Sequence, residues 1–218
     1  MGDPPPARNL ASMNSRQPVE SEEPSSSSPT DQELVEGLRA GDTPKAEALY
    51  RRIYPAISRT LRRICRFSAA DYDDLVQLSF ERVVKTLVEH RFAGACSLTT
   101  WASSIAAHVA LDMLRARTRE RRLFNMGEPR LTDDGPEVGL DPERSLEARA
   151  ELRRLQSVLG RMNGNQARTL VLHDVLGHDL AEIAVVTGVS QAAAQSRLVR
   201  GRKELIRRCR ATMARKTS

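Results

Sequence analysis

The side chains best suited to binding chemistry lie near the C-terminus, where amide, hydroxyl and guanidinium groups follow one another at helical spacing. From Arg197 to Lys216 there are nine Lys or Arg residues and one acidic residue, Glu204. Amide and guanidinium groups can hydrogen-bond the edges of bases, and a dense run of cations can hold phosphates. The side chains predicted to face bases are Gln191, Gln195, Ser196 and Arg197. Those predicted to hold phosphates are Arg200, Arg202 and Lys203, followed by Arg207 and Arg208.

The residues just before this run predict the element that positions it. Ala184 and Gly188 are four residues apart, and Val189 and Ser190 follow directly. A small residue allows two helices to approach closely, a glycine can adopt the positive φ of a tight turn, and a serine caps the next helix. The spacing therefore predicts a helix-turn-helix over residues 180–210, whose second helix can enter a DNA major groove.

Catalytic and metal-binding chemistry have no comparable signal in the sequence. No nucleophile–base pair or phosphate-binding loop is visible, and His173 and His178 are spaced five apart, which does not suit one helix face. The cysteines Cys65, Cys96 and Cys209 are far apart, as expected for packing roles in a reducing compartment. The N-terminal residues contain no apolar core of the signal-peptide type, and no apolar run approaches the roughly 18 residues of a membrane span. We expect a cytoplasmic protein that is not an enzyme, needs no cofactor or metal and does not insert into membranes.

Composition and charge predict an all-α protein with two small helical domains. Aromatic residues make up only 4% of the chain, and alternating β-branched runs are scarce. Net charge falls into blocks of −2, +4, −4 and +8 along the chain, as two nucleic-acid-facing domains on an acidic tether would give. The expected divisions are a disordered extension over 1–30, an N-terminal domain over 31–124, a flexible acidic linker over 125–145, a helix-turn-helix domain over 146–210 and a basic tail over 211–218.

Helix signals subdivide both domains. Thr30 and Glu33 predict a capping box at the first helix, and Pro55 is expected to kink or split the second. The third helix is expected to open at Asp73–Asp74, and the fourth to run from Leu98 to about Arg122. In the second domain, helices are expected over 146–159 and 165–176 ahead of the helix-turn-helix.

Two further segments each allow a functional and a purely structural interpretation. The acidic residues of the DDLVQ run at 73–77 suit a binding face, but they also stabilise any helix N-terminus. The loop that leads to Trp101, with Gly94 at its centre, could hold single-stranded nucleic acid ahead of a basic helix. The same loop could be an ordinary helix corner with Trp101 buried.

Taken together, residues 31–210 resemble the extracytoplasmic-function (ECF, group 4) sigma factors of bacterial RNA polymerase. The motifs that carry the resemblance occur in the family's order: DLVQ at 74–77, SLTTW at 97–101, ALDMLR at 110–115, EIA at 182–184, GVS at 188–190, SRL at 196–198 and RGR at 200–202. The resemblance implies sigma region 2 and region 4 domains. It also implies three partners: core polymerase, bound through the β′ clamp helices and the β flap, promoter DNA, and an anti-sigma factor.

The resemblance also implies roles for individual residues. Asp74, Gln77 and Glu81 would bind the clamp helices. The loop over 91–97 would capture a flipped base of the minus-ten promoter element. Its expected DNA contacts are Phe92, Gly94 and Ser97, joined by His108 on the minus-ten helix and by Arg115 and Arg117 on backbone phosphates. The expected minus-thirty-five readers are Gln195, Arg197 and Arg200.

Departures from the family pattern keep alternatives open. Basic residues common on the fourth helix are replaced by Ser104 and Ala107, and a common lysine is replaced by Gln195. One alternative is a conventional helix-turn-helix regulator whose N-terminal domain dimerises or senses a signal, and it predicts tight duplex binding without polymerase. A second alternative is an anti-sigma-bound or scaffold protein without promoter activity.

Overall fold

A computed structural model describes residues 28–65, 69–123 and 142–214, and these residues form helices joined by short connections, with no strand among them. The helices are α1 (Asp31–Ala40), α2 (Thr43–Ile64), α3 (Ala69–Val88), α4 (Leu98–Leu123), α5 (Pro142–Leu159), α6 (Gly164–Leu170), α7 (Leu180–Thr187) and α8 (Gln191–Ala214), with a π-helical turn, η1 (Val171–Val175), after α6. The predicted all-α class is confirmed. Most of the predicted disordered extension (1–30) and of the predicted flexible linker (125–145) lies outside the described residues, but residues 142–145 of the predicted linker belong to α5. Within the described part, no helix is long and apolar enough to cross a membrane.

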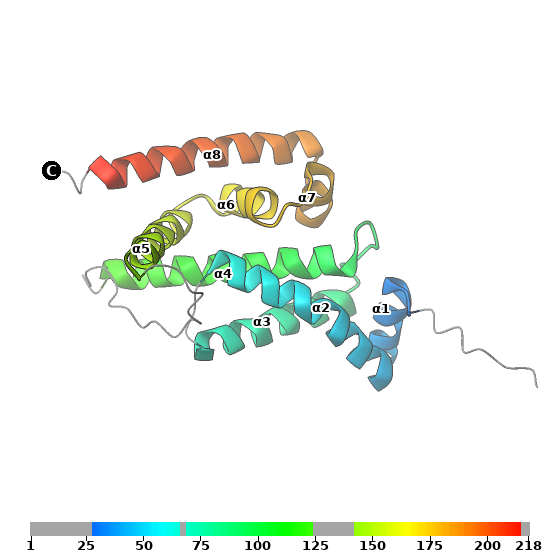
Figure 1. Cartoon of the computed structure of the whole chain (residues 1–218). Helices are drawn as coiled ribbons and strands as arrows, with labels where there is room; N and C mark the ends of the chain where they lie inside the picture. Colours follow the sequence, from blue (N-terminus) through cyan, green and yellow to red (C-terminus); the bar gives the residue numbers. More distant parts are fainter. Residues whose placement is uncertain (1–27, 66–68, 124–141, 215–218) are drawn as a thin grey trace, which may run out of the picture.

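The helices form two modules that meet along α4. The N-terminal module consists of α1 to α4, and the C-terminal module consists of α5 to α8 with η1. In Figure 1, α4 lies lengthwise between α2 and α3 on one side and α5 to α7 on the other, and α8 runs along the outer edge. Apolar side chains of both modules belong to one continuous core. The two predicted domains are therefore in direct contact.

The start of the N-terminal module follows the local sequence signals. The Glu33 amide donates to the Thr30 hydroxyl at 3.2 Å, and the Thr30 amide donates to the Glu33 carboxylate at 2.7 Å, which confirms the predicted capping box. The expectation that Pro55 splits the second helix is wrong, because α2 runs unbroken through it. Pro55 is on the exposed side of α2, where water can satisfy the carbonyl that loses its amide partner, while Ile53 and Ile57 anchor the opposite face.

Three helix boundaries differ from the sequence expectation. The α3 helix begins at Ala69, four residues before Asp73, because tertiary contacts hold its first turns: the Tyr72 hydroxyl donates to Ser58 at 2.7 Å, and Arg117 pairs with Asp71 at 2.6 Å. The α5 helix begins at Pro142, with proline at the first helical position. The helix predicted over 165–176 ends at Leu170 and continues as the π-helical turn, in which the Leu176 amide donates to the Val171 carbonyl at 3.0 Å.

The helix-turn-helix has the predicted turn chemistry. Asp179 and Glu182 form a capping box at α7, in which the Glu182 amide donates to the Asp179 carboxylate at 2.8 Å. Gly188 has a φ of 66°, a conformation that glycine adopts without steric cost. The Ser190 hydroxyl accepts the Ala193 amide at 3.2 Å and thereby caps α8. These contacts fix the angle at which α8 leaves the turn.

Candidate nucleic-acid interface

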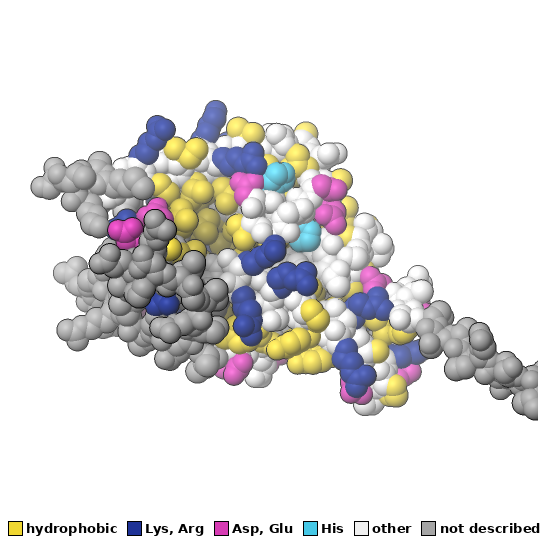
Figure 2. Space-filling model, viewed as in Figure 1, with side chains coloured by type: hydrophobic (Ala, Val, Ile, Leu, Met, Phe, Trp, Pro, Cys, Tyr) yellow, Lys and Arg dark blue, Asp and Glu magenta, His cyan; other side chains and the backbone are white. Residues whose placement is uncertain are grey.

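The N-terminal half of α8 presents most of the predicted DNA-facing side chains to solvent. Arg197 is half-buried, and the exposed members of the predicted set are Gln191, Gln195, Ser196, Arg200, Arg202 and Lys203. Lys and Arg side chains gather along the edge of the molecule that α8 forms, on the face seen in Figure 2. The outer surface of α8 can therefore approach a nucleic acid without any rearrangement of its own module.

Several basic side chains of α8 are already paired within the chain. Both Nε and Nη2 of Arg202 donate to the Asp174 carboxylate of η1, at 2.9 and 2.5 Å. The Arg202 guanidinium holds the pKa of Asp174 below its ordinary value. Arg207 and Arg208 both bind Glu204. Arg202 thus links α8 to η1 in this conformation, a role that the sequence did not reveal because Asp174 is 28 residues away.

The loop between α3 and α4 carries an aromatic pair. Phe92 packs edge-on against Trp101, with ring centroids 5.7 Å apart, and the Trp101 Nε1 donates to Thr86 at 3.3 Å. Gly94 has a φ of 72° at the tip of the loop. The Ser97 hydroxyl accepts the Thr100 amide at 3.1 Å, so Ser97 caps α4 as well as facing the loop.

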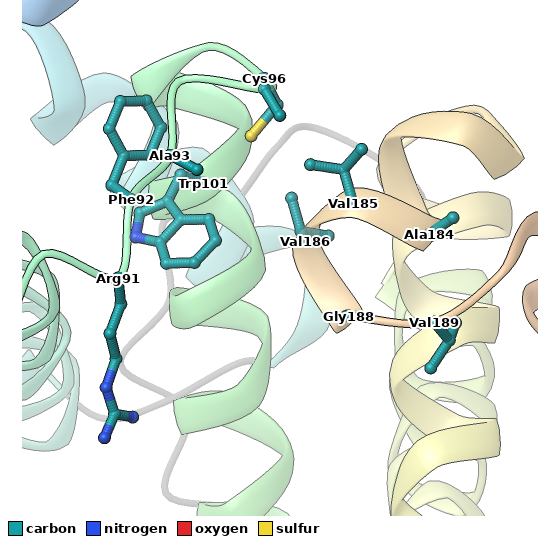
Figure 3. Close-up of a pocket in the computed structure, with 11 residues that line it drawn as sticks. Arg91, Phe92, Ala93, Cys96, Trp101, Ala184, Val185, Val186, Gly188 and Val189 are labelled. Carbon is teal, nitrogen blue, oxygen red and sulfur yellow. The ribbon is translucent and has the colours of Figure 1, made fainter.

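A cavity of about 510 Å³ lies between this loop and the helix-turn-helix. Phe92 and Trp101 form one wall, and Val185 and Val186 of α7 point towards them from the other (Figure 3). Its lining is mostly apolar. The two predicted DNA-binding elements, the loop and the helix-turn-helix, therefore share one hollow in this conformation.

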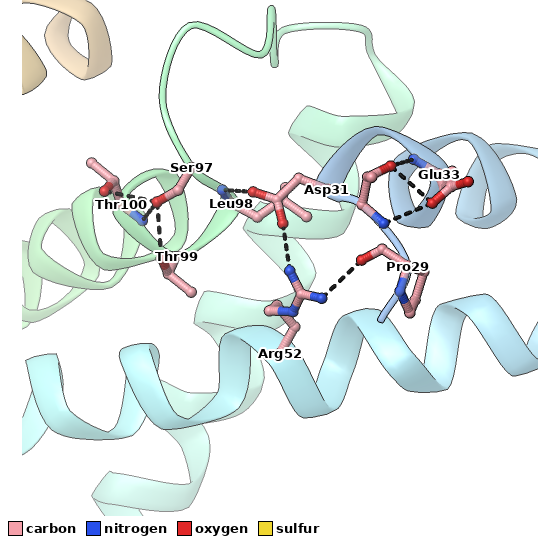
Figure 4. Close-up of polar contacts among 9 residues, drawn as sticks. Pro29, Asp31, Glu33, Arg52, Ser97, Leu98, Thr99 and Thr100 are labelled. Atoms are coloured by element: carbon pink, nitrogen blue, oxygen red, sulfur yellow. Dashed lines mark hydrogen bonds and ion pairs between the residues drawn. The ribbon is translucent and has the colours of Figure 1, made fainter. Parts of the chain in front are cut away.

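Asp31 holds this loop in place, and sequence reasoning missed it. Its carboxylate accepts the Leu98 amide at 2.8 Å and pairs with Arg52 at 2.9 Å, while Arg52 also donates to the Pro29 carbonyl (Figure 4). Asp31 thus joins α1, α2 and the first turn of α4. Because Leu98 is 67 residues away, no local pattern could have indicated the contact.

We expect Asp31→Ala to lower the free energy of unfolding by about 1–3 kcal/mol, because a buried amide and a guanidinium both lose their acceptor. Urea unfolding followed by circular dichroism measures the change. The neighbouring exposed Gln32→Ala is the control and should stay within about 0.5 kcal/mol of the parent chain. Equal stability of the two variants would mean that Asp31 does not anchor the loop.

The predicted DNA-facing residues of α4 are less accessible than those of α8. The His108 side chain is 49% exposed and lies 3.6 Å from Asp112. Burial lowers the pKa of His108, so the imidazole is neutral at neutral pH and can both donate and accept a hydrogen bond. Arg115 binds Asp112 at 2.9 Å and Arg117 binds Asp71 at 2.6 Å. Neither guanidinium is displayed as a free cation here.

The predicted polymerase-binding residues lie together on one exposed face of α3. Asp74, Gln77 and Glu81 occupy successive turns, and the Gln77 amide donates to Glu81 at 3.0 Å. Leu75 and Ser79, between them in sequence, are buried and fix the orientation of the helix. The face is therefore acidic and open to a partner.

An aromatic stack that the sequence did not predict lies at the junction of α2 and α3. The Tyr50 ring stacks on Phe80 with centroids 4.5 Å apart and on Tyr54 at 5.5 Å. Tyr50 is 48% exposed despite its size. Because Tyr50 and Phe80 are 30 residues apart in sequence, only the fold brings these two rings together.

The helices, the basic edge of α8 and the open acidic face of α3 together define an all-α, two-module nucleic-acid-binding protein. The family described as Sigma-70 region 2 matches residues 49–120, and that described as Sigma-70, region 4 matches residues 152–205. The chain belongs to the ECF RNA polymerase sigma factors. It is a transcription initiation factor that binds core RNA polymerase and promoter DNA and is not an enzyme. The conventional-regulator alternative is not favoured.

The relatives are bacterial sigma factors. The ECF RNA polymerase sigma factor SigC of Mycobacterium tuberculosis (strain CDC 1551 / Oshkosh) is 30% identical over 156 residues, which cover 69% of this chain and 79% of SigC. The sigma factor CnrH of Cupriavidus metallidurans is 30% identical over 138 residues, 62% of this chain and 71% of CnrH. The solved structure of CnrH in complex with the cytosolic domain of CnrY covers 83% of this chain and 97% of that one, at 23% identity and a TM-score of 0.49.

Proposed function

We propose that this sigma factor binds its partners through separate surfaces. In this proposal α3 binds the β′ clamp helices of core polymerase, while α4 and α8 bind promoter DNA. The observation that carries the proposal is the position of Asp74, Gln77 and Glu81. They are exposed on α3, which lies on the side of α4 away from α6 to α8 (Figure 1). Polymerase can therefore bind this face without competing with DNA bound to the C-terminal module.

The C-terminal module is proposed to read the minus-thirty-five element. Gln195 and Arg200 are exposed on α8, the second helix of the helix-turn-helix, and Arg197 lies between them on the same helix. Amide and guanidinium groups at this position can form paired hydrogen bonds with adenine and guanine edges in the major groove. Lys203 adds a cation for the neighbouring phosphates.

The loop over 91–97 and His108 are proposed to take part in minus-ten recognition. Opening a promoter requires bases to unstack, at a cost that capture of an extruded base partly offsets. Phe92 and Trp101 supply aromatic surface for a base. Both rings line the shared hollow.

A regulatory partner is proposed by analogy with a relative. CnrH, which is 30% identical to this chain over 138 residues, forms a complex with the cytosolic domain of CnrY, and we infer that an anti-sigma factor likewise restrains this chain. We further propose that this chain acts in the cytoplasm, where core RNA polymerase is found.

Reconstituted transcription tests the proposal. The purified chain is mixed with core RNA polymerase and fragmented genomic DNA of the source organism, and transcript 5′ ends are mapped by sequencing. We expect start sites that share one pair of upstream elements and that are absent with core polymerase alone. Failure of the chain to bind core polymerase, together with tight duplex binding by the chain alone, would instead favour a conventional regulator.

A further inference from the structure

A second cavity, of about 160 Å³, opens where α2 meets the first turns of α4 and the turn between η1 and α7. It shares no lining residue with the hollow between the 91–97 loop and the helix-turn-helix. None of the residues proposed to bind DNA or polymerase lines it. Its walls come from both modules, because α2, α4 and η1 pack against one another. The proposed function therefore leaves this cavity without a role.

The charged groups that line the cavity are all basic. Arg59 and Arg63 come from successive turns of α2, and His178 comes from the turn before α7. Arg59 is exposed and forms no hydrogen bond or ion pair with any residue that the structure describes. Arg63 donates to the Val175 carbonyl at 3.3 Å. Most of the donors of these two guanidinium groups can therefore bind an anion.

Hydroxyl groups line the buried part of the same cavity. Thr60 of α2 and Thr100 and Ser103 of α4 are each at most 9% exposed. The Thr100 hydroxyl is engaged, because it donates to Glu182 at 3.3 Å. Within the described part of the chain, the Thr60 and Ser103 hydroxyls form no hydrogen bond. A hydroxyl can donate to the oxygen of an anion, so these two groups complement the guanidinium groups at the entrance.

Glu182 is the carboxylate bonded to these lining side chains, although it does not line the cavity itself. Its oxygens accept from the Thr100 hydroxyl and from the Asp179 amide at 3.2 Å, and they lie 3.4 Å from Nδ1 of His178. The negative charge of Glu182 is therefore shared among three groups of the chain. Nε2 of His178 has no partner among the described residues, and it can donate to an anion when the ring is protonated.

Size and donor chemistry together select one class of ligand. At about 30 Å³ per water molecule, the cavity has room for about five waters, which suits a tetrahedral oxyanion but not a nucleoside. The planar fork of a guanidinium matches two oxygens of a phosphate. No acidic residue lines the cavity, so a dianion would meet no like charge on its walls.

We propose that this cavity binds a phosphoryl group, in which Arg59 and Arg63 hold the charge and Thr60 and Ser103 donate to the inner oxygens. The ligand is inorganic phosphate or the terminal phosphoryl group of a nucleotide whose nucleoside stays outside the cavity. Because the lining residues come from α2, α4 and the turn before α7, the bound anion joins the two modules. It binds the folded chain and therefore stabilises it against unfolding.

Arg59→Ala tests the site without disturbing the fold. Arg59 is exposed and has no partner among the described residues to lose, so the stability of the chain without ligand should change little. Arg63→Ala is a second test variant. Arg51→Ala is the matched control, because it removes an exposed guanidinium of the same helix that lies outside the cavity and pairs with Glu47.

Isothermal titration calorimetry of the full chain with sodium phosphate, at constant ionic strength, measures binding. We expect the parent chain and Arg51→Ala to bind equally, and Arg59→Ala to bind at least about tenfold more weakly, because a charge-assisted hydrogen bond is lost. The melting temperature should rise with phosphate concentration in the parent chain and much less in Arg59→Ala. Titration with ATP, without a divalent metal, distinguishes the sources: binding of both ligands supports a site for the phosphoryl group alone, and binding of ATP alone supports additional contacts to its nucleoside.

Equal affinities of the parent chain, Arg59→Ala and Arg63→Ala for phosphate and for ATP would overturn the proposal, as would a parent chain that binds neither ligand. Sodium sulfate at the same ionic strength tests for general screening of the basic chain. An equal rise in melting temperature of all four proteins in both salts would also overturn the site.

A 12-nucleotide oligo-dT is the last ligand. If Arg59→Ala weakens its binding while the parent chain binds neither phosphate nor ATP, the two arginines hold the backbone of a nucleic acid instead, and the small-ligand site is overturned. No titration contains polymerase or a promoter, so failure of the parent chain to initiate transcription would count against the proposed function alone.

Discussion

The double substitution D74K/E81K should weaken binding to core RNA polymerase by at least about 100-fold, because losing one partner of an interfacial charge pair costs about 2–5 kcal/mol. Both carboxylates lie on the open face of α3, and reversing their charge turns attraction to a basic partner surface into repulsion. Co-elution and a fluorescence titration with core polymerase measure the loss. Promoter-dependent transcripts should disappear in parallel.

The fold of this variant should be intact. Asp74 and Glu81 are exposed, and the contact given up, the Gln77–Glu81 hydrogen bond, is itself at the surface, where such pairs contribute little. The matched control is E36K/E47K, which reverses two exposed acids on α1 and α2. Equal weakening by test and control variants would mean that overall charge, rather than the α3 face, governs binding.

Features that depend on a few neighbouring residues could be predicted from the sequence. The capping box joins Thr30 and Glu33, three residues apart, and the Ser190 cap joins residues at the same separation. The positive φ of Gly188 depends on that glycine alone. Each is decided by local backbone geometry. The helix-turn-helix follows from such signals alone, so its position was correct to within a few residues.

Features that depend on packing could not be predicted in this way. The Arg168–Ser104 contact joins residues 64 apart, and the Asp31–Leu98 contact joins residues 67 apart. Pro55 shows the same limit, because whether this local signal interrupts α2 depends on which side of the helix faces water. The sequence indicated which groups are able to bind DNA, but not that Arg115, Arg117 and Arg202 are each paired to a carboxylate in the free chain.

Removing the base-contacting side chains of α8 should also have a large effect, on promoter affinity. We expect Q195A/R197A to lower the affinity of the holoenzyme for its promoter by at least about 30-fold, because each well-placed side chain–base contact is worth about 1–3 kcal/mol. Binding of the variant to core polymerase should be unchanged, since α8 is on the far side of α4 from α3 (Figure 1). Filter binding with the mapped promoter and with a copy scrambled at the minus-thirty-five element measures both affinity and discrimination.

Lys203→Ala is the control variant that separates recognition of bases from general attraction to the phosphates. It removes one positive charge, as Q195A/R197A does, but from a side chain proposed to hold phosphate. It should weaken binding to both promoters equally and make the affinity less sensitive to salt. Q195A/R197A should instead bind the mapped and the scrambled promoter with the same affinity, because the amide and guanidinium groups that distinguish bases are gone. If Q195A/R197A still discriminates as the parent does, the minus-thirty-five element is read by other residues of α8, and Gln191 and Arg200 are the exposed side chains to test next.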